Sequence, residues 1–209
     1  VEKHRENHIP LESVYMDIDY MERFKDFTVN QERFPDFPEF VKEMKEQHIH
    51  LVPIIDAGVK VEEGYEVYEE GVEKGYFCKE KDGKEFVAGV WPGKVHFPDV
   101  LNKDARKWFG DKYQVLLDQG IEGFWNDMNE PASFKGPLPD DVQFADEDDT
   151  VILHKDAHNI YGHCMAMATK DGWLKYDGRR PFIITRAAYA GTQRYALVWT
   201  GDNQSIWAH

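Results

Sequence analysis

The sequence predicts an α/β protein, specifically a segment of a TIM (β/α)8 barrel, and three observations support this. Short apolar runs alternate with segments of helical periodicity along the 209 residues, as in successive βα units. Several runs end on aspartate, which places polar groups at the carboxyl ends of the strands, where barrel sites form. Five strands can be identified, too few to close a barrel, so we expect a piece of a longer protein. A flavodoxin-like open sheet is the alternative, but no Gly-rich phosphate loop follows any strand.

The first part of the chain supplies two strands and the helix between them. Ser13–Ile18 is the first predicted strand. Apolar residues then recur at helical spacing over Phe37–Met44, and Pro38 suits the first turn of that helix. Ile49–Ile55 is the second strand, and Asp56 follows it directly.

Two stretches are predicted to leave the barrel as excursions, near residues 59–98 and 131–153. In the first, Glu62–Glu73 is acidic and helical in character, and two β-prone runs flank Lys81-Asp82-Gly83-Lys84, where Asp-Gly indicates a hairpin turn. In the second, the acidic cluster Asp146–Asp149 lacks the spacing of an EF-hand and is interpreted as solvated charge.

The remaining barrel elements are a helix at Asp104–Leu117, a strand at Ile121–Trp125, a helix at His154–Lys170, and strands at Pro181–Arg186 and Tyr195–Thr200. The link between the last two strands is too short for the usual crossover helix, so one βα unit is reduced to a loop. The final residues, 205–209, have the pattern of a helix start. We expect one domain.

Composition narrows the function. The formal net charge of −14 disfavours nucleic acid and acidic membrane surfaces as partners, and no apolar run is long enough to span a membrane. The two cysteines, Cys78 and Cys164, lie far apart without neighbouring ligands, so we expect neither a disulfide framework nor a zinc site, and a cytoplasmic location. Aromatic residues make up 14% of the chain, a surplus that favours sugar binding next to carboxylates.

Two segments share one form, a strand with a tryptophan followed by an aspartate. Trp125 precedes Asp127, and Trp199 precedes Asp202. One such aspartate alone would be interpreted as a structural group that caps the next loop. Two of them at the same edge of a parallel sheet match the requirement of glycoside hydrolysis for a nucleophile and a general acid.

The run from Trp125 to Pro131, Trp-Asn-Asp-Met-Asn-Glu-Pro, resembles the signature of glycoside hydrolase family 31, the α-glucosidase family. Other segments are similar to family segments in the same order: Asp17-Ile18-Asp19-Tyr20-Met21 with Asp26-Phe27-Thr28, Val90-Trp91-Pro92-Gly93, Phe97-Pro98-Asp99 and Trp199-Thr200-Gly201-Asp202. The resemblance implies that residues 1–209 are part of the catalytic barrel and cover about strands 2 to 6. It also implies that the family's N-terminal β-sandwich and C-terminal β domains lie outside this chain.

What the resemblance implies about activity is a retaining exo-α-glucosidase that removes terminal α-linked glucose from short oligosaccharides such as maltose or isomaltose. Asp127 would be the nucleophile that forms a covalent glucosyl-aspartate, and Asp202 the general acid/base. Arg186 would bond sugar hydroxyls and hold Asp127 ionised. Asp56 and Glu130 would orient their neighbours. The substrate-binding residues implied are Asp17, Ile54, Trp91, Trp125, Met128, Arg186 and Trp199; for the apolar ones plain core packing is the alternative.

The sequence is also compatible with other activities. An α-xylosidase or an α-glucosyl transferase would share the same machinery, and a non-catalytic sugar-binding member would keep the fold but is expected to lose one acid. No cofactor is expected. No metal is expected either, because His154 and His158 are spaced i, i+4 without the glutamate of a zincin helix. The linkage preference and the oligomeric state are not indicated by the sequence.

Overall fold

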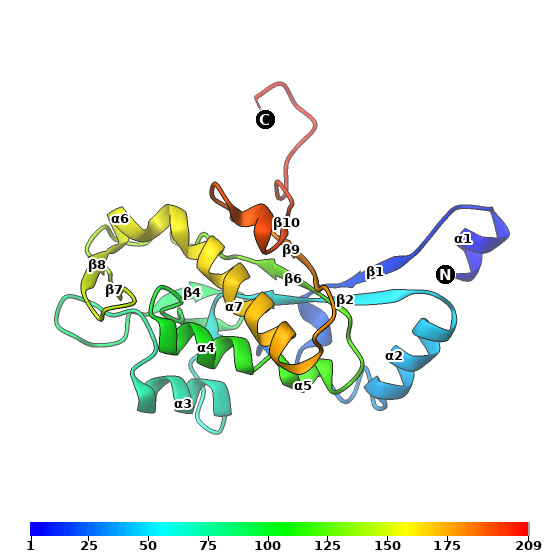
Figure 1. The fold of residues 1–209 in the computed structure, drawn as a ribbon, viewed down its shortest axis with the longest axis horizontal. Coiled ribbons are helices and arrows are strands. Elements are labelled where there is room, and N and C mark those ends of the chain that lie inside the picture. Colours follow the sequence, from blue (N-terminus) through cyan, green and yellow to red (C-terminus); the bar gives the residue numbers. More distant parts are fainter. Residues whose placement is uncertain (209) are drawn as a thin grey trace.

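The computed structural model describes residues 1–208 and is built around a five-stranded sheet in the order β1-β2-β6-β9-β10 (Figure 1). The strands are β1 (Ser13–Met16), β2 (His50–Asp56), β6 (Gly123–Asp127), β9 (Phe182–Thr185) and β10 (Leu197–Val198). Every pairing in this sheet is parallel. The spatial order follows the chain order without reversal, which is the order of a barrel and not of a doubly wound sheet with its switch point. The predicted fold class is therefore confirmed, and the flavodoxin-like alternative is wrong.

Helices α4, α5 and α7 lie along one side of this sheet (Figure 1). The helices of the chain are α1 (Glu2–Glu6), α2 (Phe37–Glu46), α3 (Glu66–Lys74), α4 (Lys103–Asp111), α5 (Gln114–Leu117), α6 (His154–Ala157) and α7 (Tyr161–Tyr176). The Asp36 side chain accepts the Glu39 N–H at the start of α2, where Pro38 lies in the first turn as predicted. Among residues 1–208, no helix combines the length and hydrophobicity needed to span a bilayer.

The close crossing of α4 and α7 depends on two glycines. A Cβ atom added to Gly172 would lie 2.0 Å from the carbonyl oxygen of Gly110, and one added to Gly110 would lie 2.5 Å from that of Ala168. Any larger side chain at either position would force the helices apart. This contact seats α7 over β6 and β9, the strands that end at the site.

The two stretches outside the main sheet form small antiparallel sheets. β3 (Val59–Lys60), β5 (Gly93–His96) and β4 (Ala88–Val90) pair in that order, and β7 (Gln143–Ala145) pairs with β8 (Val151–Leu153). The expected hairpin around Lys81–Lys84 is reduced to a turn with an isolated bridge, because the regular pairing in this stretch is between β4 and β5.

Several predicted boundaries are wrong. The helix expected at Glu62–Glu73 begins at Glu66, after a turn in which Gly64 has a φ of +77°. The helix expected at Asp104–Leu117 is divided into α4 and α5. The helix expected at His154–Lys170 is divided into α6, a 3₁₀ turn and α7.

The predicted elements near the C-terminus also differ from the structure. The strand expected at Tyr195–Thr200 shortens to β10 because a 3₁₀ turn at Thr192–Arg194 occupies the link before it. Trp199 still extends the ladder, donating its N–H to the Thr185 carbonyl at 3.0 Å. Residues 205–208 form bends and a turn where a helix start was expected, and His209 lies outside the described residues.

Candidate active site at the carboxyl ends of the strands

Strand alternation explains which side chains meet at this edge of the sheet. Phe124 and Asn126 of β6 point outward, where they contact Trp173 and Thr169 of α7. Because side chains alternate along a strand, Trp125 and Asp127 point to the opposite, inner face. The same period of two places Ile54 and Asp56 of β2 in one inner row, in register with Trp125 and Asp127.

Arg186, which follows β9, joins the two predicted catalytic acids. Its Nε lies 3.1 Å from Asp127 Oδ1, and its Nη1 lies 3.9 Å from Asp202 Oδ2. The guanidinium also forms a two-pronged hydrogen bond with Glu130, from Nε to Oε1 at 2.8 Å and from Nη2 to Oε2 at 2.9 Å. Nη2 also lies 3.2 Å from the sulfur of Met128. One cation thus faces three carboxyl groups.

Opposing effects act on the pKa of the Asp127 carboxyl group. It is 7% exposed, and burial raises the pKa of its carboxyl above the ordinary value. The charge of Arg186 and the Met128 N–H act in the other direction but do not cancel the burial. The Nε–H of Arg186 is directed to Glu130, and Asp127 Oδ1 has no aligned hydrogen bond within residues 1–208. Arg186 therefore opposes the effect of burial on Asp127 without lowering the pKa of Asp127 below its usual value.

Asp56 and Asp17 border the same region. Asp56 is 4% exposed, and burial and the nearby Asp127 raise the pKa of its carboxyl to about 7. Asp17 is exposed and caps a 3₁₀ turn at Ile18–Tyr20, where its Oδ1 accepts the Ile18 N–H at 2.7 Å. The charge of Asp17 also contributes to the raised pKa of Asp56, which places the two carboxyls near each other.

Apolar site residues form a wall beside the acids. The rings of Trp125 and Trp199 meet edge to face with centroids 5.3 Å apart, and Tyr15 meets Trp125 on another side at 6.2 Å. The indole N–H of Trp125 is buried without a hydrogen-bond partner in the described residues. Met128 and Ile54 are buried next to this wall.

Trp91 stands apart from this group. It lies in the turn between β4 and β5, is 49% exposed, and packs edge to face against Phe134 with centroids 4.9 Å apart. The Phe134 N–H also bonds to the Gly89 carbonyl, so this hairpin is attached to the loop after β6. The structure therefore does not bring Trp91 into direct contact with the acids.

Two asparagines that sequence reasoning did not assign to the site hold it in place. Asn129 is fully buried; its Nδ2 donates to Thr185 Oγ1 at 2.8 Å, and its Oδ1 accepts the Ala187 N–H at 3.0 Å, on either side of Arg186. Asn126 closes a ring of hydrogen bonds with Tyr113 and Thr169. The only sequence signal for their role was that both lie within the Trp125–Pro131 run. The sequence does not show which residues a buried amide contacts, so their roles could not be predicted.

Asp202 is the most open member of the site, with a side chain that is 85% exposed. It follows β10 at the edge of the sheet, and the chain beyond it extends away from the body of the protein (Figure 1). Trp199, which precedes Asp202 in the sequence, therefore does not shield this acid from water in the described residues. Asp202, Arg186 and Glu130 line a cavity of about 460 Å³ together with His158, Asn159, Ala187, Ala188, Thr200 and Gly201.

His154 and His158, the pair spaced i, i+4, contact each other. The Nδ1 of His158 lies 3.1 Å from the Nε2 of His154, so the two rings hydrogen-bond to each other. Within residues 1–208, no group of three or more histidine, cysteine, aspartate or glutamate side chains is arranged to hold a metal ion.

A pair of carboxyl groups sharing one arginine, at the carboxyl ends of barrel strands and beside an aromatic wall, defines the class of barrel glycoside hydrolases. The chain belongs to glycoside hydrolase family 31: the family model described as "Glycosyl hydrolases family 31 TIM-barrel domain" matches residues 1–209.

Named relatives agree with this assignment. "Alpha-glucosidase 2" of Bacillus thermoamyloliquefaciens is 47% identical over 206 residues, which cover 98% of this chain and 26% of the relative. The crystal structure of a family 31 α-glucosidase from Bacteroides thetaiotaomicron has a TM-score of 0.82 and 38% identity, covering all of this chain and 34% of its own. A glucosidase II α subunit with alpha3-Glc2 bound has a TM-score of 0.90 and 33% identity, covering 99% of this chain and 23% of its own. The chain thus spans between about a quarter and a third of these proteins.

Proposed function

We propose that the protein carrying this chain is a retaining exo-α-glucosidase that releases terminal α-linked glucose from short oligosaccharides of the maltose or isomaltose type. The observation that carries the proposal is that one guanidinium, that of Arg186, lies 3.1 Å from Asp127 and 3.9 Å from Asp202. The similarity to proteins named α-glucosidase supports the substrate class.

In the first step, the ionised Asp127 attacks the anomeric carbon while the bond from that carbon to the departing oxygen breaks. Asp202 gives its proton to that oxygen, so the leaving group departs as a neutral alcohol. The product on the enzyme is a glucosyl ester of Asp127. Arg186 neutralises the negative charge of Asp127 before the attack. This ion pair is lost as the ester forms, because the ester carries no charge.

In the second step, Asp202 takes a proton from water, and the resulting hydroxide attacks the anomeric carbon from the face that the aglycone left. The ester bond to Asp127 breaks, and its carboxylate is restored beside Arg186. Two inversions give net retention, so the first glucose released has the α configuration. Retention requires carboxyl groups about 5–5.5 Å apart, a separation that we expect in a crystal structure of the natural-length protein.

The aromatic wall supplies binding. Trp125 and Trp199 offer flat apolar surface to the C–H face of a sugar. Asp17 is exposed near Asp56, where it can accept hydrogen bonds from hydroxyls remote from the anomeric carbon.

The test is hydrolysis of maltose and isomaltose by the natural-length protein, with the released anomer followed by NMR. We expect α-glucose to appear first and to mutarotate later. Initial β-glucose would refute the retaining mechanism. Turnover of α-xylosides in preference to both sugars would identify an α-xylosidase, transfer to sugar acceptors in place of water would identify a transferase, and binding without turnover would identify a non-catalytic member.

A further inference from the structure

Asp26 is a buried carboxyl group directly behind the strand end that carries Asp56. It is 1% exposed. Its Oδ1 accepts the backbone N–H of Asp56 at 2.9 Å, and its Oδ2 has no hydrogen-bond partner within residues 1–208. Asp26 opens the Asp26-Phe27-Thr28 run, to which the reaction proposed above gives no task.

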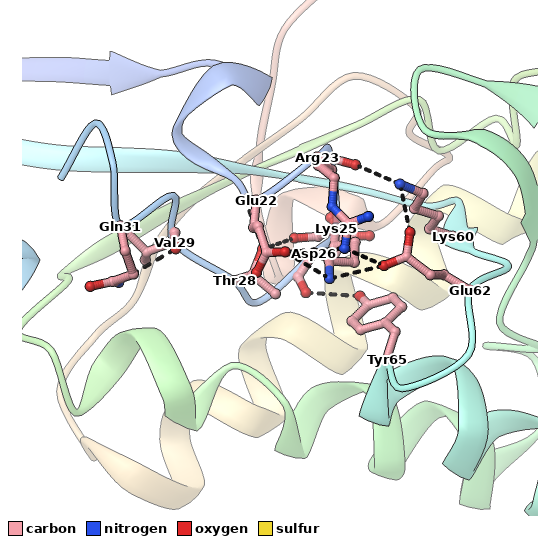
Figure 2. Close-up of polar contacts among 10 residues, drawn as sticks. All are labelled: Glu22, Arg23, Lys25, Asp26, Thr28, Val29, Gln31, Lys60, Glu62 and Tyr65. Atoms are coloured by element: carbon pink, nitrogen blue, oxygen red, sulfur yellow. Dashed lines mark hydrogen bonds and ion pairs between the residues drawn. The ribbon is translucent and has the colours of Figure 1, made fainter. Parts of the chain in front are cut away.

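The loop that carries Asp26 is fastened from the outside, as Figure 2 shows. Lys25 forms ion pairs with Glu22 at 3.2 Å and with Glu62 at 3.3 Å, and Arg23 reaches Glu62 at 2.6 Å. The hydroxyl of Tyr65 donates to the Asp26 carbonyl oxygen at 2.8 Å. These contacts hold the Asp26 backbone in place. Because Arg23 and Lys25 pair with Glu22 and Glu62, these cations do not pair with the Asp26 carboxyl group.

An ionised Asp26 would be costly in this setting. A buried carboxylate needs several donors or a cation to replace its water, and the only hydrogen bond to this carboxyl in the described residues comes from one backbone N–H. Burial and the adjacent Asp56 raise the pKa of Asp26 well above the ordinary value. Burial, the single hydrogen bond and the adjacent Asp56 thus favour the uncharged form of Asp26, in which it acts as a hydrogen-bonding group.

The position that Asp26 holds is the last rung before the nucleophile. β2 and β6 pair at three positions, Ile54 with Trp125, Ile55 with Asn126, and Asp56 with Asp127. The pairing of β2 with β6 ends at Asp56 and Asp127, so no later backbone pairing between these strands holds their ends in place. A displacement of about 1 Å at a reacting group can cost about 100-fold in rate, so an anchor on the Asp56 backbone has a direct catalytic value.

We propose that Asp26 is a positioning residue of the glucosidase site: its uncharged carboxyl anchors the Asp56 backbone and, through the Asp56–Asp127 rung, sets where Asp127 stands relative to Arg186. The proposal rests on the role of Asp127 as nucleophile. Asparagine in place of Asp26 would keep the acceptor for the Asp56 N–H and remain uncharged. Alanine would leave that buried N–H without a partner.

The experiment compares Asp26→Ala and Asp26→Asn in the natural-length protein, with active sites counted by trapping with 5-fluoro-α-glucosyl fluoride so that only folded sites enter kcat. We expect Asp26→Ala to lower kcat by about 10- to 100-fold while KM changes less than about 3-fold. Asp26→Asn should restore kcat to within about 2-fold of the wild type.

Val41→Ala is the matched control, because Val41 is buried in α2 and its loss lowers stability without touching the strand ends. It should lower Tm and leave kcat unchanged. If Asp26→Ala lowered Tm in the same way and kept the wild-type kcat, the role of Asp26 would be structural only and the proposal would be overturned.

A large loss of kcat in Asp26→Asn would also overturn the proposal, because it would show that the site needs a charged carboxylate at this position. This result is decisive even if Asp26→Ala does not fold. The trapping reaction separates this result from failure of the proposed function. A wild-type protein without an adduct on Asp127 would refute the nucleophile, whereas an adduct together with either outcome above would refute only the role of Asp26.

Discussion

Asp56 and Asp127 are register partners at the carboxyl ends of β2 and β6, so two buried acids share the last rung of one ladder. Burial and the proximity of Asp127 raise the pKa of Asp56 to about 7. A carboxyl whose pKa is raised on folding stabilises the protein fully below its unfolded pKa, and that contribution is lost as the pH rises through the folded pKa. The affected window for Asp56 therefore runs from about pH 4 to above pH 7.

Asp56→Asn should accordingly stabilise the protein at pH 8 by on the order of 4 kcal/mol relative to the wild type, and should give no such gain at pH 4. The asparagine has nearly the same volume and carries no charge to bury. Thermal unfolding of both proteins at the two pH values measures the difference. An equal change in Tm at both pH values would show that ionisation of Asp56 is not the cause.

Asp127→Asn tests the nucleophile. The amide cannot attack the anomeric carbon, so kcat should fall by at least about 10⁴-fold. The fold should persist, because asparagine fills the same space at the end of β6 and does not bring a charge into a buried site. Initial rates on maltose and a circular dichroism spectrum test both points. Turnover near the wild-type rate would place the nucleophile elsewhere.

Arg186→Met tests the electrostatic control of Asp127. The arginine opposes the effect of burial on the pKa of Asp127, so its removal should raise that pKa further. Because Asp127 must be ionised to attack, the acid limb of kcat/KM should move to higher pH. α-Glucosyl fluoride is the suitable substrate, since fluoride departs without a proton and the profile then reports Asp127. An acid limb that stays in place would show that Arg186 does not tune this group.

Asp202→Ala tests the division of labour between the acids. The variant should still be glucosylated on Asp127 by α-glucosyl fluoride, because that leaving group requires no acid, whereas maltose should not react. Azide should then attack the ester from the face that Asp202 vacated and yield α-glucosyl azide. Equal loss of both substrates, with no adduct on Asp127 by mass spectrometry, would exclude Asp202 as the acid.

The ring formed by Tyr113, Asn126 and Thr169 supports the outer face of β6. Asn126→Leu and Tyr113→Phe should each destabilise the protein by about 1–3 kcal/mol, because each leaves buried polar partners unsatisfied. The double variant should lose less than the sum of the two, as expected for groups in one network. Thermal unfolding of the four proteins of this cycle is the measurement, and strict additivity would contradict a closed ring.

Much of this architecture could be predicted from local patterns. The helix at α2 follows from apolar spacing and from Pro38, and the positions of β2 and β6 follow from apolar runs that end on Asp56 and Asp127. The helices predicted at Asp104–Leu117 and His154–Lys170 are each divided in the structure, and α7 continues to Tyr176, because apolar periodicity does not show where a helix breaks. It also does not show a close helix crossing such as that of Gly110 with Gly172.

The Trp125–Pro131 run and the second tryptophan–aspartate segment already indicate two acids on one barrel edge, so the class of chemistry can be predicted without a structure. The electrostatics of the two acids depend on the three-dimensional arrangement. Burial outweighs Arg186 at Asp127, Asp202 remains exposed, and Asp26 comes to lie behind Asp56, 30 positions further along the chain. The physical reason is that desolvation and charge pairing depend on which segments surround a group in space, and that information is absent from the spacing of residues along the chain.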